Sequence, residues 1–89
     1  MNKKMMEMLA CPIDKHFPLE IFEANSKEEN VLEGAIYCTK CSRFYPIIEE
    51  IPIMLPDELR DKNQDTAFLK RNQSTLPEKI TKQALPWHL

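Results

Sequence analysis

The chain is poor in several things that particular classes of protein require. A single glycine among 89 residues leaves no material for a glycine-rich phosphate-binding loop. Three cysteines, an odd number, argue against a disulfide framework and favour a reducing compartment. No apolar run approaches the length of a membrane span, and the start "MNKKMMEMLA" is interrupted by Glu7, unlike a signal peptide. We therefore expect a cytoplasmic protein without membrane contact.

The sequence also lacks the residue groupings of a catalytic site. Glu49 and Glu50 are adjacent, and adjacent residues of a strand point to opposite faces, so they do not form an acid–base pair. No nucleophile stands in a recognisable pattern with a base, and the short chain leaves little length to build a substrate pocket. We expect the protein not to be an enzyme.

Charge and pattern divide the chain near its middle. Residues 1–65 carry 8 basic and 13 acidic side chains, whereas residues 66–89 carry 4 basic and 1 acidic, which gives about −5 and +3. Strand-like alternation is also lost after Pro56. We therefore predict a ribbon domain over residues 1–60 and a helical C-terminal extension over residues 61–89. Within the extension, residues 66–89 are expected to form a semi-independent tail.

Hydrophobic spacing predicts an α+β fold. Three- and four-residue spacing indicates a short N-terminal helix, and alternation indicates short strands separated by polar turns. Residues 3–10 are the expected helix, residues 17–23, 31–38, 43–47 and 51–55 the expected strands, and two helical pieces follow from Pro56 to Leu69 and from Ser74 to Leu85. The prediction is a small zinc-ribbon-like antiparallel sheet of three to four short strands, with a short N-terminal helix and C-terminal helices.

Proline and glycine add expectations about the strands. Pro46 and Pro52 cannot donate to a strand ladder, so their strands are expected at edges or with their open side turned outward. Gly34 lies inside a strand, which often marks a bulge or a close backbone approach.

Cysteine spacing predicts a metal site. Cys11-x2-Asp14 and Cys38-x2-Cys41 have the frame of a zinc ribbon, in which two residues between ligands let both side chains reach one ion. Asp14 stands where the fourth cysteine is usual, and a carboxylate is an accepted zinc ligand. One structural zinc ion per chain is the favoured interpretation. With three thiolates and one carboxylate as ligands, the site as a whole would carry a surplus negative charge. That charge calls for nearby donors and cations, for which the candidates are Lys15, His16, Lys40 and Arg43.

Other interpretations of these cysteines stay open at this point. His16 or a water molecule is an alternative fourth ligand. The site is alternatively metal-free, with Cys38 and Cys41 as small buried side chains and Asp14 as a turn cap. A redox pair is disfavoured, because Cys38 and Cys41 lie between strands rather than at the start of a helix.

The segment "FYPIIEEIPIML" has the features of a docking surface. Ile51 alternates with Ile53 and Leu55, which leaves Pro52 and Met54 for the opposite face. Prolines limit self-pairing along such an edge, and a methionine adapts to a partner's surface. The predicted partner-binding residues are Phe44, Tyr45, Ile51, Pro52 and Met54, with the two aromatic rings as anchors and burial in the core as the competing interpretation.

Three motifs together resemble a known family. "MLACPIDK", "CTKCSRFYPI" and "IPIMLPDELR" occur here in the order found in the tRNA methyltransferase 112-subunit family of small zinc-ribbon proteins. The similarity spans roughly residues 3–60, and a helical insertion of eukaryotic members is absent between Phe22 and Val31, which indicates a short prokaryotic form. The family's metal positions fall on Cys11, Asp14, Cys38 and Cys41. Glu50 replaces the glycine that most members have in the turn before Ile-Pro.

The resemblance implies a non-catalytic subunit. Family members bind, stabilise and activate S-adenosylmethionine-dependent methyltransferases that act on tRNA, rRNA or a release factor. The resemblance therefore implies a cytoplasmic heterodimer that takes part in translation and tRNA modification. Direct binding of nucleic acid by this chain is not expected. The alternative is a free-standing zinc-ribbon nucleic-acid binder. Its basic face would have to come from the tail, through Lys70, Arg71, Lys79 and Lys82, because the ribbon body is acidic.

Overall fold

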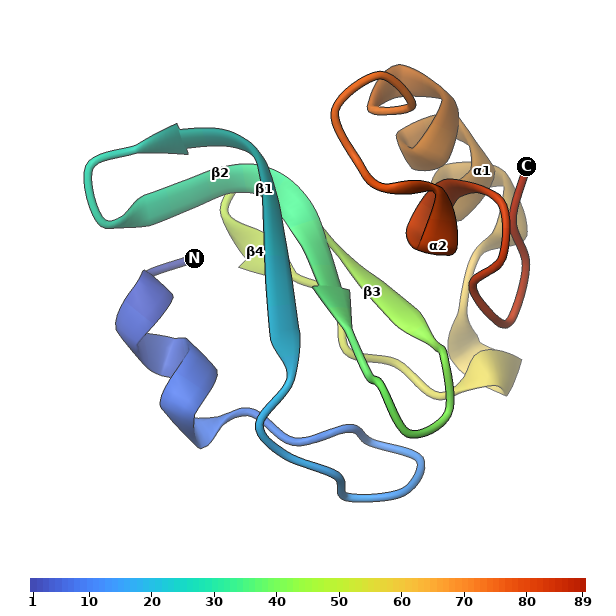
Figure 1. Cartoon of the computed structure of the whole chain (residues 1–89), viewed down its shortest axis with the longest axis horizontal. Coiled ribbons are helices and arrows are strands. Elements are labelled where there is room, and N and C mark those ends of the chain that lie inside the picture. Colours follow the sequence, from blue (N-terminus) through green and yellow to red (C-terminus); the bar gives the residue numbers. More distant parts are fainter.

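The computed structural model shows one four-stranded antiparallel sheet with short helices before and after it (Figure 1). It describes the backbone of residues 1–89 and all side chains except those of Met6 and Glu7. The strands lie side by side in chain order, which confirms the predicted α+β class and antiparallel ribbon. In order, the elements are η1 (Lys3–Met8), β1 (Glu20–Lys27), β2 (Asn30–Tyr37), β3 (Phe44–Ile48), β4 (Ile51–Pro52), η2 (Asp57–Leu59), α1 (Lys62–Arg71) and α2 (Glu78–Thr81).

The β1–β2 hairpin is longer than its sequence pattern indicates. Both strands run into the polar segment expected as a loop, so the turn itself is reduced to Glu28 and Glu29. The strand register shifts opposite Gly34, as expected for a bulge. A Cβ atom on Gly34 would lie 2.7 Å from the carbonyl oxygen of Phe22, so glycine is needed for close approach of the two backbones.

Only one of the two proline-containing strands lies at an edge. β4 is an edge strand, but β3 lies between β2 and β4, so the first of the two expected alternatives, an edge position, is wrong for β3. The carbonyl oxygen of Pro46 accepts a hydrogen bond from the Ile53 amide at 2.9 Å. In an antiparallel strand the nitrogen and the carbonyl oxygen of one residue point to the same side, so the side of Pro46 that lacks an N–H donor faces β4. β4 already ends at Pro52, and the hydrogen bonds between β2 and β3 are not interrupted.

The turn between β3 and β4 keeps its tight form without glycine. Glu49 and Glu50 have φ values of 50° and 70°, the left-handed region that a two-residue type I′ turn requires. Two exposed glutamates thus take conformations that glycine, asparagine or aspartate adopt more easily.

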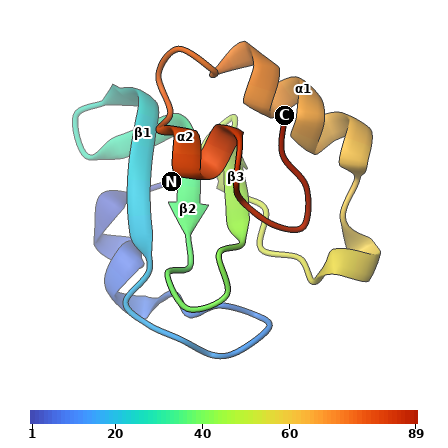
Figure 2. The ribbon, with the colours of Figure 1, turned by 45° about the vertical axis from the view of Figure 1, so that its right-hand side comes forward.

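The two faces of the sheet carry separate hydrophobic clusters. On one side α1 and α2 cover the sheet, and η1 lies on the other (Figures 1 and 2). The first cluster consists of Met1, Cys11, Leu19, Val31, Ile36, Cys38, Tyr45 and Ile47. The second joins Ala35, Tyr37 and Phe44 of the sheet to Phe68, Leu69, Leu76, Ile80 and Ala84 of the C-terminal part. Residues 66–89 thus pack on the ribbon. That the metal site stays intact when residues 66–89 are removed is still a prediction.

The C-terminal helices are shorter and more interrupted than predicted. Arg60 has an extended backbone and separates η2 from α1, whose N-cap Asp61 accepts a hydrogen bond from the Gln64 amide. The second piece forms helix only after Pro77, as the single turn α2. None of the helices in the described part of the chain combines the length and the apolar character that crossing a bilayer requires.

Candidate metal centre

The loop that carries Cys11 and Asp14 has the backbone of a metal knuckle. The Cys11 amide donates to the His16 carbonyl oxygen at 3.0 Å, and the Lys15 amide donates to the Cys11 carbonyl oxygen at 2.9 Å. Lys15 closes the turn with φ of 63°.

The loop that carries Cys38 and Cys41 repeats this arrangement. The Cys38 amide donates to the Arg43 carbonyl oxygen at 2.9 Å, and the Ser42 amide donates to the Cys38 carbonyl oxygen at 2.9 Å. Ser42 has φ of 62°. The first loop therefore keeps the knuckle backbone of the second, even though Asp14 occupies the place of a second cysteine.

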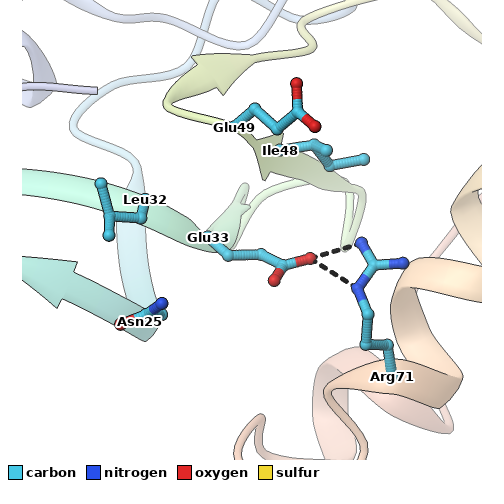
Figure 3. A pocket seen from close by; sticks show the side chains of 6 residues that line it. All are labelled: Asn25, Leu32, Glu33, Ile48, Glu49 and Arg71. Atoms are coloured by element: carbon cyan, nitrogen blue, oxygen red, sulfur yellow. Dashed lines mark hydrogen bonds and ion pairs between the residues drawn. The ribbon is translucent and has the colours of Figure 1, made fainter.

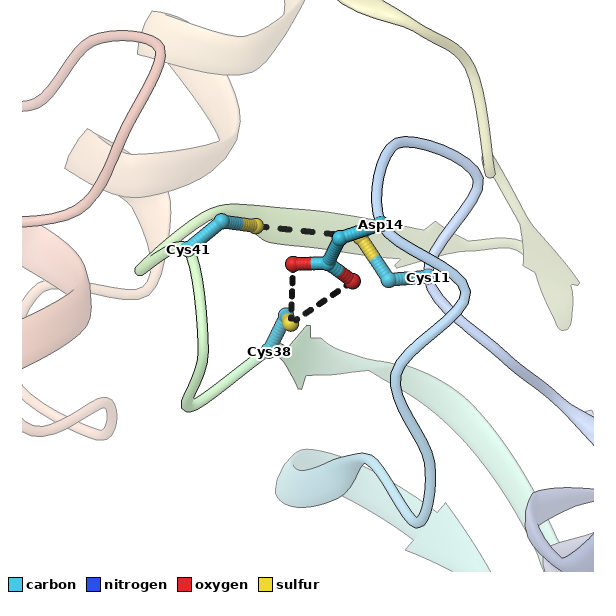
Figure 4. Close-up of side chains that lie close together, drawn as sticks. All are labelled: Cys11, Asp14, Cys38 and Cys41. Carbon is cyan, nitrogen blue, oxygen red and sulfur yellow. Dashed lines mark hydrogen bonds between the residues drawn. The ribbon is translucent and has the colours of Figure 1, made fainter.

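The two knuckles bring four ligand-type side chains together (Figure 4). One ligand atom from each of Cys11, Asp14, Cys38 and Cys41 lies within 4.8 Å of all the others. The sulfur atoms of Cys11 and Cys41 are 3.7 Å apart, and the Cys38 sulfur lies 3.7 and 3.6 Å from the Asp14 oxygens. Tetrahedral zinc with Zn–S bonds of about 2.3 Å and a Zn–O bond of about 2.0 Å sets sulfurs about 3.8 Å apart and sulfur and oxygen about 3.5 Å apart. The cluster therefore fits a zinc ion.

Asp14 and His16 are positioned differently toward this cluster. The His16 amide donates to Asp14 Oδ1 at 2.9 Å, which lowers the pKa of Asp14 and favours the charged carboxylate. The His16 ring instead has Nε2 3.3 Å from Thr39 Oγ1. The geometry places Asp14 among the candidate ligands, with His16 holding it through the backbone.

The thiol pKa values of Cys38 and Cys11 are shifted in opposite directions. Burial raises the pKa of Cys38 to about 11. Burial also acts to raise the pKa of Cys11, but hydrogen bonds from the Tyr45 hydroxyl and the backbone of Asp14 and Ile13 bring it below its ordinary value. Metal binding requires thiolates, so it would release protons from this site.

Of the cations expected near the site, Arg43 is fixed in place. Its Nε and Nη2 donate to the two carboxylate oxygens of Asp57 at 2.9 and 2.7 Å. The Asp57 carboxylate, and after it Cys41, raise the pKa of Arg43, so the guanidinium stays charged. Lys15 and Lys40 are exposed.

Tyr45 contacts the candidate metal centre, which its sequence pattern did not predict. Its hydroxyl oxygen lies 3.1 Å from Cys11 Sγ, in a fully buried setting. The available signal was strand alternation after the second knuckle, which turns Phe44 and Tyr45 to opposite faces and must bring one of them to the metal side.

The predicted partner-binding residues are divided between core and surface. Phe44 and Tyr45 have no exposed area, so in this conformation neither ring is available to a partner protein. Ile51 is 62% exposed, Pro52 is partly buried, and Met54 packs against the cluster that contains Cys11. The expected alternation is lost because β4 ends at Pro52.

A hollow of about 410 Å³ lies away from the cysteines (Figure 3). Asn25, Leu32, Glu33, Ile48, Glu49 and Arg71 line it. Nε and Nη2 of Arg71 both donate to Oε1 of Glu33, and this contact joins the basic extension to the acidic ribbon across the hollow.

A small antiparallel sheet with two facing knuckles and a Cys3Asp cluster defines a protein of the zinc-ribbon class. Within that class the chain belongs to the Trm112p-like protein family, whose model matches residues 2–50. Residues 51–89 lie outside this match.

Relatives and a solved structure agree with this assignment. The UPF0434 protein of Dechloromonas aromatica (strain RCB) is 32% identical over 65 residues, which are 73% of this chain and 97% of that protein. The UPF0434 protein of Methylobacillus flagellatus is 40% identical over 60 residues, 67% of this chain and 85% of that protein. The Haloferax volcanii Trm112 methyltransferase activator, solved in complex with a protein assigned as a methyltransferase, is similar with a TM-score of 0.64 and 32% identity, covering 67% of this chain and 100% of that one.

Proposed function

We propose that this protein is a non-catalytic subunit that binds, stabilises and activates S-adenosylmethionine-dependent methyltransferases. The observation that carries the proposal is the similarity to the Haloferax volcanii methyltransferase activator, which extends over the whole of that chain at 32% identity. The substrates we propose for the partner are those implied by the sequence motifs, namely tRNA, rRNA or a release factor.

The metal cluster supports a structural rather than a catalytic role. Three cysteines and Asp14 could supply four ligands, which would be a complete set for tetrahedral zinc. A catalytic zinc site keeps one position open for water or substrate. We propose one structural zinc ion per chain, held by Cys11, Asp14, Cys38 and Cys41, that fixes the two knuckles to each other.

We propose that the methyltransferase docks along β4, over Ile51, Pro52 and Met54. Ile51 is the most exposed of these apolar side chains, and its strand is the free edge of the sheet beside β3. An extended segment of the partner can pair with such an edge, while its side chains contact the apolar residues. Phe44 and Tyr45 would support this surface from inside.

The segment that follows β4 is held firmly to the ribbon. The Ile53 amide donates to the Pro46 carbonyl oxygen, Met54 packs on the metal-side cluster, and Asp57 forms its paired contact with Arg43. A surface held in one conformation loses less conformational entropy on binding than a mobile one. The metal knuckles and the proposed docking edge are therefore parts of one rigid unit.

The basic extension gives little support to a nucleic-acid-binding role. Arg71 is paired with Glu33, and Lys79 lies 2.9 Å from Glu20. These contacts pair two acidic side chains of the ribbon with two of the four basic side chains on which that role would depend. A salt-dependent shift of RNA by the isolated protein would reverse this judgement.

Affinity purification from the native cell, followed by mass spectrometry, tests the proposal. A tagged wild-type chain should recover a methyltransferase in stoichiometric amount, and Ile51→Asp should lose it while remaining folded. Leu59→Asp is the matched control, because Leu59 is 64% exposed and lies outside β4. Recovery of no methyltransferase by the wild-type chain contradicts the proposed function, and equal recovery by Ile51→Asp contradicts the proposed edge.

A further inference from the structure

Tyr45 lies between the core of the sheet and the candidate metal centre. It is the second residue of β3, the strand that follows the second knuckle. Its side chain is fully buried in the cluster that contains Cys11 and Cys38. Its hydroxyl oxygen is 3.1 Å from Cys11 Sγ, within the range of a hydrogen bond to sulfur. A buried hydroxyl is expected to have such a partner, and Cys11 supplies it.

The donor set makes this contact chemically important. Three thiolates, one carboxylate and a doubly positive ion sum to a charge of −2, so the sulfurs of this site would hold more electron density than those of a neutral site. Hydrogen bonds to ligand atoms spread that charge and fix the direction in which each ligand points. Asp14 has such a donor in the His16 amide, at 2.9 Å.

We propose that Tyr45 is the corresponding positioning residue for Cys11: its hydroxyl donates a hydrogen bond to the Cys11 thiolate and strengthens metal binding. A thiolate has no proton to give, so the tyrosine must be the donor. The inference rests on the metal site and not on the identity of a methyltransferase partner.

The surroundings of Tyr45 keep it in the donor state. A tyrosine phenol ordinarily loses its proton only near about pH 10, and full burial disfavours the charged phenolate further, so the hydroxyl keeps its proton across the physiological range. The Arg60 guanidinium carbon lies 5.2 Å from the centre of the Tyr45 ring. A cation at the ring draws electron density from it, which makes the hydroxyl a better donor. Arg60 follows η2, so the last residue of the ribbon domain contributes to the setting of the metal centre.

Tyr45→Phe removes the hydroxyl and leaves the ring, and Tyr37→Phe is the matched control. Tyr37 is also buried, but it belongs to the cluster on the opposite face of the sheet. Zinc affinity is measured by competition with a chelator on the full chain. Tyr45→Phe is expected to bind zinc about tenfold more weakly, the lower end of the effect of losing a partner of a metal ligand. Tyr37→Phe is expected to match the wild type within about twofold.

The absorption spectrum of the cobalt-substituted protein reports on the hydrogen bond to the thiolate, which a change in packing alone would not alter. A hydrogen bond stabilises the sulfur orbital from which the thiolate-to-cobalt charge-transfer band arises, so its loss should shift that band to longer wavelength in Tyr45→Phe. Ring-fluorinated tyrosine can be incorporated into Tyr37→Phe protein, so that only position 45 carries the label. Its hydroxyl is a stronger hydrogen-bond donor, and the band should shift to shorter wavelength. This second measurement decides the matter even if Tyr45→Phe does not fold.

The outcomes separate the possible failures. Unchanged affinity together with an unshifted band in both altered proteins overturns the role of Tyr45. A wild-type chain that takes up neither zinc nor cobalt overturns the metal site along with it. Neither result affects the methyltransferase proposal, which is decided by co-purification.

Discussion

Arg60 and Asp65 form an ion pair inside the protein, where their side chains are only 1% and 2% exposed and Nη2 lies 2.9 Å from Oδ2. The Trp87 indole donates to the same carboxylate oxygen at 3.1 Å, and Arg60 Nη1 donates to the Phe44 carbonyl oxygen at 2.5 Å. This network joins β3, α1 and the C-terminal residues.

Loss of the Asp65 charge should destabilise the whole chain. Asp65→Asn leaves the guanidinium of Arg60 buried without a counter-charge, so we expect the free energy of unfolding to fall by about 3 kcal/mol. Asp61→Asn makes the same chemical change at the exposed N-cap of α1, where asparagine caps equally well, and should change little. Urea unfolding compares the two. Equal unfolding midpoints would show that the buried pair contributes nothing to stability.

A glycine in the tight β3–β4 turn should stabilise the protein. Glu50 has φ of 70°, so Glu50→Gly relieves a left-handed strain of about 1–2 kcal/mol, partly offset by the freedom that glycine adds to the unfolded chain. We expect a net gain of about 0.5–1 kcal/mol. Glu29→Gly, in the other hairpin turn at a residue without positive φ, should instead lose stability. Thermal unfolding distinguishes them, and a loss at Glu50 would contradict the turn geometry.

Asp14 and not His16 should complete the metal site. Asp14→Ala removes an oxygen 3.6 Å from Cys38 Sγ, so zinc affinity should fall by at least about tenfold. His16→Ala keeps the backbone amide that holds Asp14 and should retain zinc. Metal analysis and chelator competition on both variants settle the ligand. Full zinc in Asp14→Ala with loss in His16→Ala would reverse the assignment.

Removal of the C-terminal extension should leave the metal centre in place but uncover an apolar face. In a chain ending at Arg60, the knuckles and the metal-side cluster are all present, while Ala35, Tyr37 and Phe44 lose the helices that bury them. We expect a full equivalent of zinc together with concentration-dependent self-association, measured by metal analysis and sedimentation. A truncated chain that neither folds nor holds zinc would show that residues 61–89 belong to the ribbon domain.

Local spacing was enough to predict some features and not others. The knuckle frame of Cys11 and Cys38 and the close approach at Gly34 follow from patterns a few residues long, and the antiparallel sheet followed from the alternation in the strand segments. The break at Arg60 and the burial of Phe44 did not, because both depend on tertiary contacts: Arg60 meets Asp65 and the distant Trp87, and Phe44 stacks on Phe68. Helical propensity across Arg60 is overridden by the extended backbone that carries its side chain into the core.

Methyl transfer by the reconstituted complex tests the central claim most directly. The methyltransferase that co-purifies with the chain is assayed with labelled S-adenosylmethionine and its substrate, alone and with the purified chain added. We predict no transfer by this chain alone, weak transfer by the methyltransferase alone, and a large increase when both are present that Ile51→Asp fails to produce. A methyltransferase whose activity, stability and cofactor binding are the same with and without this chain would contradict the account.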